Sequence, residues 1–165
     1  MTTTTLKARD IAARPPVTVR GDATLEEAAL LMLQLDVGSL LVVDDRNHLV
    51  GILTDADFGV VAAPVSGGET PEPQVLGNRL TGQAERIYRA ARTRRVRDVM
   101  SAPVVTVEAD DDIETVLGRM FASHIRHIPV VTRHCPVGVI STRDLLQLVF
   151  AKRGGRVPAR IEEDQ

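Results

Sequence analysis

An internal repeat constrains the fold of this 165-residue chain more than any other feature of its sequence. The segment Val17-Thr18-Val19 recurs 88 residues later as Val105-Thr106-Val107, and Asp10 recurs at the same interval as Asp98. Repetition at a fixed interval indicates that one structural unit occurs twice. We therefore expect a fold made of two similar halves.

Each half continues with the apolar spacing of an amphipathic helix. Thr24 and Glu27 have the pattern of a capping box, and the acidic residues 110–112 offer capping oxygens and favourable charge to the second helix. Both helices are thus predicted to begin at a defined signal. The apolar positions of the two helices, again 88 residues apart, are Leu25, Ala28, Ala29, Met32 and Leu33, then Ile113, Val116, Leu117, Met120 and Phe121.

A β-hairpin is predicted after each helix, because two short aliphatic runs flank a polar turn at residues 44–48 and again at 132–136. The interval between the halves falls to 87 at Gly51 and Gly138, so one residue is predicted to be missing from the second turn. Each half then closes with the pattern Gly-x-x-Thr/Ser-x-x-Asp, which we interpret as a strand followed by a short helix.

A unit with the order strand, helix, strand, strand, helix cannot bury all its apolar faces alone, so two copies are expected to pack together. We predict an α/β (α+β) fold of two tandem β-α-β-β-α motifs with pseudo-two-fold symmetry and mixed sheets. The predicted boundaries are 7–61 for the first motif, 62–95 for a loop and a linker helix, 96–150 for the second motif and 151–165 for a flexible tail. Both motifs are expected to form one compact module.

The bulk composition excludes several classes of protein. Charged residues make up 25% of the chain and the net charge is -2, so the overall charge does not attract nucleic acid or an acidic membrane. No apolar run reaches the roughly 18 residues of a membrane helix, and the start lacks the regions of a secretory signal. Cys135 is the single cysteine and fits a reducing compartment. We expect a cytoplasmic protein without membrane contact.

The twice-occurring pattern resembles the CBS motif, and the tandem pair resembles the Bateman module, over about Lys7 to Phe58 and Val96 to Phe150. Repeat order, helix periodicity and the closing element agree in this resemblance. It implies a regulatory module that binds an adenosine-containing ligand (AMP, ADP, ATP or similar) in the cleft between the two motifs, with no other cofactor required. It also implies an isologous homodimer and a regulated partner protein that the sequence does not identify.

The closing element supplies the candidate ligand site. A Thr or Ser three residues before an Asp places a hydroxyl and a carboxylate near one helix N-terminus, where they could hold a ribose and a phosphate. The resemblance implies that Asp57 and Asp144 accept hydrogen bonds from ribose hydroxyls, with Thr54 and Ser141 nearer the ribose or phosphate. The same residues are also common helix caps, and the two roles are compatible.

By the same resemblance, Arg126 and His127 reach the ligand phosphates, and Arg143 adds positive charge beside Asp144. The alternative is a solvated charge at a strand end and a histidine in a structural hydrogen bond. The base is implied to lie against four aliphatic residues, any of which could instead be core, Ile140 above all. They are Pro103, Val104, Ile125 and Ile140.

The first half departs from this pattern. It has no basic residue in Val37-Gly38-Ser39-Leu40, Leu41 stands in the proline position, and Ala56 replaces the basic residue beside the second Asp. We therefore expect binding to centre on Ser141 and Asp144.

Two other groups of residues have the chemistry of a site, but their patterns fit one less well. His124, His127, His134 and Cys135 contain zinc-ligand types but lack the paired spacing of zinc folds, so no metal site is predicted. An arginine cluster could contact a phosphate backbone, which keeps nucleic-acid binding as a minor hypothesis, although a solvated helix face explains it better. Its members are Arg86, Arg89, Arg92, Arg94, Arg95 and Arg97.

The sequence contains neither a nucleophile elbow nor a Walker A loop, so no catalytic residue and no enzyme activity are predicted. Two functions then remain open. The first is a ligand-sensing regulatory module, and the second is a ligand-free scaffold that serves dimerisation or partner docking.

Overall fold

A computed structural model of the chain describes residues 6–12, 14–61 and 87–152. These residues belong to two compact units, which we name by their place in the sequence. The inner unit is Pro16–Val104, and the outer unit joins Met1–Pro15 to Val105–Gln165. The predicted loop from residue 62, the first residues of the linker helix (83–86) and the tail from residue 153 lie outside the described residues.

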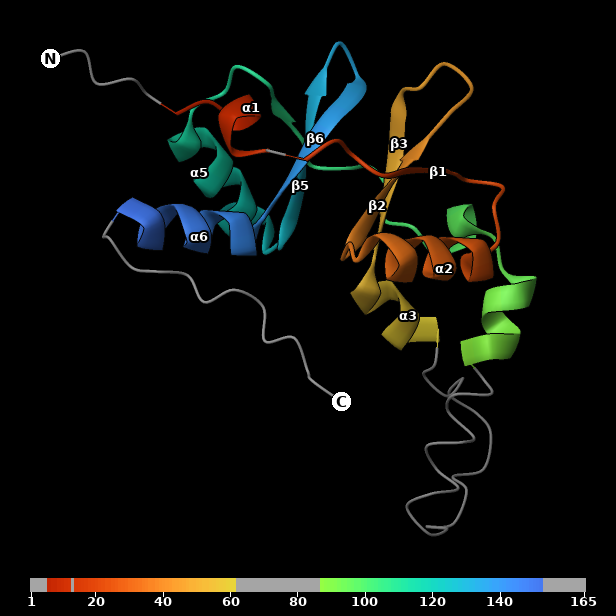
Figure 1. Ribbon diagram of the computed structural model, residues 1–165. Coiled ribbons are helices and arrows are strands. Elements are labelled where there is room, and N and C mark those ends of the chain that lie inside the picture. The colour runs from red at the N-terminus through yellow and green to blue at the C-terminus, as the bar shows by residue number, and fades with distance from the viewer. Residues whose placement is uncertain (1–5, 13, 62–86, 153–165) are drawn as a thin grey trace, which may run out of the picture. The chain divides into compact units, whose positions relative to one another are not determined.

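The inner unit contains a three-stranded sheet in the order β1-β2-β3 (Figure 1). Strand β2 is central; it pairs parallel with β1 and antiparallel with β3. Helical turns also occur over residues 87–93, inside the predicted linker helix. The elements are β1 (Thr18–Arg20), α2 (Leu25–Leu35), β2 (Ser39–Val43), β3 (Leu49–Thr54), α3 (Asp55–Val61) and the 3-10 helix η1 (Val96–Asp98).

The outer unit repeats this plan with the sheet order β4-β5-β6, in which β5 is central, parallel to β4 and antiparallel to β6. The predicted order of strands and helices and the mixed sheets are therefore confirmed in both halves. The elements are α1 (Ala8–Ile11), β4 (Val107–Glu108), α5 (Ile113–Ser123), β5 (His127–Thr132), β6 (Cys135–Ser141) and α6 (Thr142–Lys152).

Helices α2 and α5 begin at the predicted caps. The amide of Glu27 donates to the hydroxyl of Thr24, and the Thr24 amide donates back to the Glu27 carboxylate, which completes the capping box. Asp112 caps α5 by accepting a hydrogen bond of 2.8 Å from the Thr115 amide. These amide bonds lower the pKa of the Glu27 carboxyl and the pKa of the Asp112 carboxyl.

The residue missing from the second half lies in the hairpin turn, as predicted. Five residues separate the paired Val43 and Leu49 in the inner unit, whereas four separate Val131 and Pro136 in the outer unit. The shorter hairpin of the outer unit closes with a two-residue turn, Arg133-His134, in which both residues have positive φ (51° and 69°). Two positive φ values define the type I′ turn, whose twist matches that of the flanking strands.

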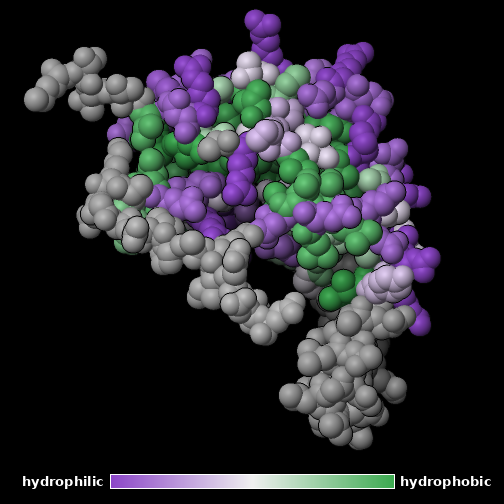
Figure 2. All heavy atoms as spheres, viewed as in Figure 1, coloured by the Kyte–Doolittle hydropathy of each residue, from purple (hydrophilic) through white to green (hydrophobic). Residues whose placement is uncertain are grey.

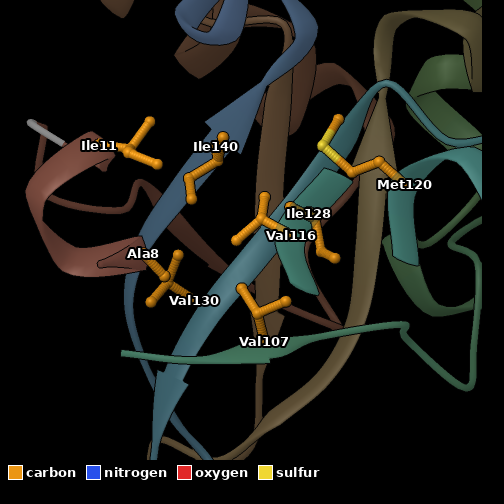
Figure 3. Close-up of a cluster of buried hydrophobic side chains, with 8 residues drawn as sticks. All are labelled: Ala8, Ile11, Val107, Val116, Met120, Ile128, Val130 and Ile140. Carbon is orange, nitrogen blue, oxygen red and sulfur yellow. The ribbon is translucent and has the colours of Figure 1, made fainter. Parts of the chain in front are cut away.

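Each unit has its own apolar core, made of matching repeat positions, and Figure 3 shows the core of the outer unit. One face of α5 packs on the sheet of the outer unit, and the matching face of α2 packs in the inner unit. Two predicted positions differ: Leu33 is 77% exposed and Phe121 is 74% exposed, because the last position of the apolar pattern turns away from the sheet. The matched core pairs are Ala28 and Val116, Met32 and Met120, Leu40 and Ile128, Val42 and Val130, and Leu53 and Ile140.

The segments that precede the two repeats are exchanged between them. Residues 6–12, which begin the first repeat, belong to the outer unit with the second repeat, and residues 94–100 belong to the inner unit with the first. The compact units thus divide the chain at 15/16 and 104/105, a division different from the predicted motif boundaries, which describe the sequence repeat and stay a prediction.

Candidate functional site

Strand β6 and helix α6 meet at Ser141 and Asp144, which lie against each other. The Ser141 amide and the Ser141 hydroxyl both donate to Oδ2 of Asp144, each over 2.7 Å. In return the Asp144 amide donates to the Ser141 hydroxyl over 3.2 Å. The predicted pairing of a hydroxyl and a carboxylate at a helix start is therefore present, and it forms a helix cap.

The basic residues predicted for phosphate lie beside this pair. His127 is the strand partner of Ser141 across β5 and β6. The Thr142 amide donates to the carbonyl of Arg126 over 2.9 Å, which joins the entry of β5 to the first turn of α6. Two segments separated by about 15 residues in sequence, Arg126-His127 and Ser141-Thr142, thus meet at one end of the sheet.

Two exposed arginines belong to this end of the outer unit. Arg126 and Arg143 are both exposed, and neither forms an ion pair with any residue in the described part of the chain. The first amides of an α-helix add partial positive charge. The arrangement offers a carboxylate for hydroxyl groups and cations for an anion.

The inner unit carries the same cap without the cations. The Thr54 amide and hydroxyl donate to Oδ2 of Asp57, over 2.6 and 3.1 Å. The Asp55 amide donates to the carbonyl of Gly38, which matches the bond from Thr142 to Arg126. Asp55 and Ala56 stand where the outer unit has Thr142 and Arg143, so this end carries two carboxylates and no basic residue among the aligned positions.

The four aliphatic candidates do not share one place. Ile140 is fully buried in the core of the outer unit, as its core interpretation predicted, and Ile125 is half-buried against that core. Pro103 and Val104 belong to the inner unit, two and three residues beyond Ser101, which forms a β-bridge with Ile52 of β3. Of the two candidates in the outer unit, Ile125 is therefore the one that is not fully buried in the core.

The rival sites gain no support from the described residues. No group of three or more His, Cys, Asp or Glu side chains in residues 6–12, 14–61 and 87–152 is arranged to hold a metal ion. In the arginine cluster, Arg92 lies 3.8 Å from Glu26 and over the ring of Tyr88, and Arg95 donates to the carbonyl of Asp22. None of the described helices is long and apolar enough to cross a bilayer.

Sequence reasoning missed two residues at these helix starts. Thr142 links α6 to the Arg126 carbonyl through its amide and, over 3.4 Å, its hydroxyl. Asp55, at the equivalent place in the inner unit, adds a second carboxylate beside Asp57. A position-by-position alignment of the two closing elements could have found them, because it pairs Thr142 with Asp55 and Arg143 with Ala56.

Comparison with known proteins identifies the family of the chain. The CBS domain family matches residues 8–58 and 96–151, and the chain belongs to that family. It is similar to the CBS domain-containing protein YhcV of Bacillus subtilis, with 30% identity over 129 residues that cover 78% of this chain and 74% of YhcV. Other curated relatives are longer, and the chain spans from 23% to 60% of the length of four of them.

Solved structures share the fold. The CBS domain of a CBS domain-containing membrane protein from Sphaerobacter thermophilus superposes with a TM-score of 0.70 at 36% identity, covering 87% of this chain and 88% of that one. The CBS domain pair of protein MJ0100, solved with 5-methylthioadenosine and S-adenosyl-L-methionine, gives a TM-score of 0.66 at 23% identity, covering 90% and 98%. The chain is therefore a CBS domain pair in fold.

Proposed function

We propose that this chain is a regulatory module that binds an adenosine-containing ligand, such as AMP, ADP or ATP, at the Ser141–Asp144 end of the outer unit. The observation that carries the proposal is the meeting of a carboxylate, a hydroxyl and two arginines at one end of a sheet, the arginines having no ion pair with another described residue. The proposed action is binding alone, in a cytoplasmic setting, without a catalytic step.

Asp144 fits the ribose. Both hydrogen bonds from Ser141 go to Oδ2, and within the described residues no donor lies against Oδ1. A carboxylate oxygen with free lone pairs accepts hydrogen bonds from vicinal hydroxyl groups. Capping α6 and holding a ribose therefore use different oxygens of one side chain.

Arg126, His127 and Arg143 fit the phosphates. Guanidinium groups bind phosphate oxygens through two parallel hydrogen bonds, and Arg126 and Arg143 reach solvent beside the start of α6. The base would lie near Ile125, and Pro103 and Val104 stay candidates from the inner unit. Thr54 and Asp57 form a second proposed site, which is weaker for a phosphate because Asp55 adds negative charge there.

A related fold supports the ligand class. The CBS domain pair of MJ0100 was solved with two adenosyl compounds, at an identity to this chain that shows the fold alone. Regulation would follow if the ligand bound one conformation of the module better than another and so shifted the populations. The regulated partner would then respond to the favoured conformation.

A thermal-shift screen of the full chain tests the proposal, with AMP, ADP, ATP, NAD, S-adenosylmethionine and cyclic dinucleotides as probes. A ligand at a hundred times its dissociation constant adds about 2.7 kcal/mol of stability. We expect a shift that Asp144→Ala abolishes and that Asp57→Ala, at the weaker second site, reduces much less. No shift with any probe at millimolar concentration would count against the proposal.

That negative result would favour the second candidate, a scaffold that works through its surfaces. Leu33 and Phe121 occupy the same repeat position and are both largely exposed, so each unit has an exposed apolar side chain at that position. Apolar side chains also reach the surface in patches between hydrophilic ones on the face shown in Figure 2. We propose an isologous homodimer that covers such residues. Light scattering should then show a dimer that the double variant Leu33→Ser/Phe121→Ser dissociates.

A further inference from the structure

The segment that begins the first repeat is built into the unit that holds Ser141 and Asp144. The Ala8 amide donates to the carbonyl of Asp111 over 2.8 Å, and the Arg9 amide donates to the carbonyl of Ala109 over 3.1 Å. The Ile113 amide donates back to the carbonyl of Leu6 over 3.2 Å. Three backbone bonds therefore fasten residues 6–9 to the start of α5, more than a hundred residues away in sequence.

The same three bonds recur in the inner unit, which excludes chance packing. Val96 donates to Ala23 over 2.9 Å, Arg97 donates to Gly21 over 2.9 Å, and Leu25 donates to Arg94 over 3.1 Å. Each donor and acceptor lies 88 residues from its counterpart in the outer unit. The exchange of leading segments is thus a repeated structural element.

Helix α1 also touches the two elements that carry the candidate site. It packs against β6, which ends at Ser141, and against α6, which contains Asp144. Ala8 and Ile11 are buried in the core of the outer unit, where Figure 3 shows Ile11 beside Ile140 of β6. A displaced α1 would remove side chains from one face of this strand and helix.

Ala12 lies directly against Gly138 of β6. A Cβ placed on Gly138 would lie 2.6 Å from the Cβ of Ala12, far inside van der Waals contact. Gly138 is required here because the chain after α1 passes directly over β6. The glycine lies three residues before Ser141 on the same strand.

We propose that Lys7–Ala12 is the positioning segment of the Ser141–Asp144 end, and that Ala12 on Gly138 is the contact through which it acts. A force applied to the chain before Leu6 by another protein or domain would then alter the packing of the second repeat. It would not alter the packing of the first repeat, although that repeat follows directly in sequence. The expectation that such a change alters nucleotide affinity rests on the function proposed above.

Hydrogen exchange of the full-length chain tests the contact without a ligand. Gly138→Ala should force Ala12 away and speed amide exchange at residues 8–12 and 141–144 by about ten- to a hundredfold, the effect of moderate overpacking. Ala12→Gly removes the clashing Cβ, so the double variant Gly138→Ala/Ala12→Gly should restore slow exchange at both segments. Calorimetry on the folded proteins should show weaker ATP binding for Gly138→Ala and recovered binding for Gly138→Ala/Ala12→Gly.

Gly51→Ala is the matched control, because its Cβ would meet Met100 of the other leading segment and not Ala12. It should leave exchange at residues 8–12 and 141–144 unchanged, and Ala12→Gly should not correct any change that it causes in the inner unit. The proposal is overturned if Gly138→Ala leaves residues 141–144 protected, or if Ala12→Gly does not restore them. Absence of ATP binding in the wild-type chain would count against the proposed function alone, since the exchange result needs no nucleotide.

Discussion

Ser141 donates two hydrogen bonds to a single oxygen of Asp144, one from its amide and one from its hydroxyl, each 2.7 Å long. The bonds hold the end of β6 to the first turn of α6. Since the hydroxyl also accepts from the Asp144 amide, it serves as the cap of the helix.

Ser141→Ala should therefore destabilise the outer unit even without a ligand. Loss of a serine cap costs about 1 kcal/mol, which urea unfolding can resolve. Ser123→Ala, at the exposed end of α5, is the control and should change the free energy of unfolding by less than about 0.5 kcal/mol. If Ser141→Ala left the free energy of unfolding unchanged, the cap bond would contribute nothing to stability.

Arg126→Ala should separate phosphate recognition from ribose recognition. We expect ATP affinity to fall about tenfold or more, since a hydrogen bond to a charged group contributes roughly 1.5–3 kcal/mol, while adenosine affinity stays the same. Calorimetry with both ligands makes the comparison. Arg133→Ala, in the turn at the opposite end of the same hairpin, should affect neither ligand, and equal losses for both ligands would contradict a phosphate contact.

Ile140→Ala should behave as a core substitution. Ile140 is fully buried, and truncating a buried isoleucine to alanine costs about 2–5 kcal/mol. The measurement is the free energy of unfolding in the absence of nucleotide. Val137→Ala, on the exposed face of the same strand, is the control. A stable Ile140→Ala protein that had lost only ligand affinity would return Ile140 to the ligand site.

His124→Gly should stabilise the chain. His124 ends α5 in the left-handed conformation, with φ of 52°, which glycine adopts without the steric cost of a Cβ. We expect a net gain of about 0.5–1 kcal/mol in thermal or urea unfolding, because relief of the left-handed strain exceeds the larger unfolded-state entropy of glycine. His124→Ala is the matched variant and should give no gain, because alanine keeps the Cβ; equal effects of the two variants would contradict this explanation.

Acid should destabilise the chain through its caps. The Thr115 amide lowers the pKa of Asp112 in the folded state, so the cap's stabilisation is present above the unfolded pKa of about 3.9 and is lost as pH falls through the lower folded value. Asp112→Asn keeps a capping oxygen but does not titrate. Its unfolding free energy should fall less than that of wild type between pH 5 and pH 2, and an equal fall in the two proteins would contradict this cause.

The sequence was sufficient to predict the order of the elements and the start of both long helices. Thr24 and Asp112 are local signals, because a cap bonds to an amide three residues away. The shortened turn was also predictable, since the interval of the repeat changes between Val131 and Gly138. These features depend on contacts between residues that are close in sequence.

The exchanged leading segments were not predictable in the same way. The apolar residues Ala8 and Val96 show that each leading segment is buried, but a repeat pattern is identical whichever sheet each segment joins. The partner is shown by long-range backbone bonds, such as those from Ala8 to Asp111 and from Val96 to Ala23. For the same reason Pro103 and Val104, assigned by resemblance to the site of Ser141, belong to the other compact unit.

A chain with a single copy of this motif could not complete its own packing, because its leading segment would have no sheet of a second copy to join. Two such chains could complete each other by donating their leading segments, as partners do in a domain-swapped dimer. Fusion of the two copies would then enclose a former contact between subunits within one polypeptide. Ala12 over Gly138 and Met100 over Gly51 would be the two halves of that ancestral two-fold interface.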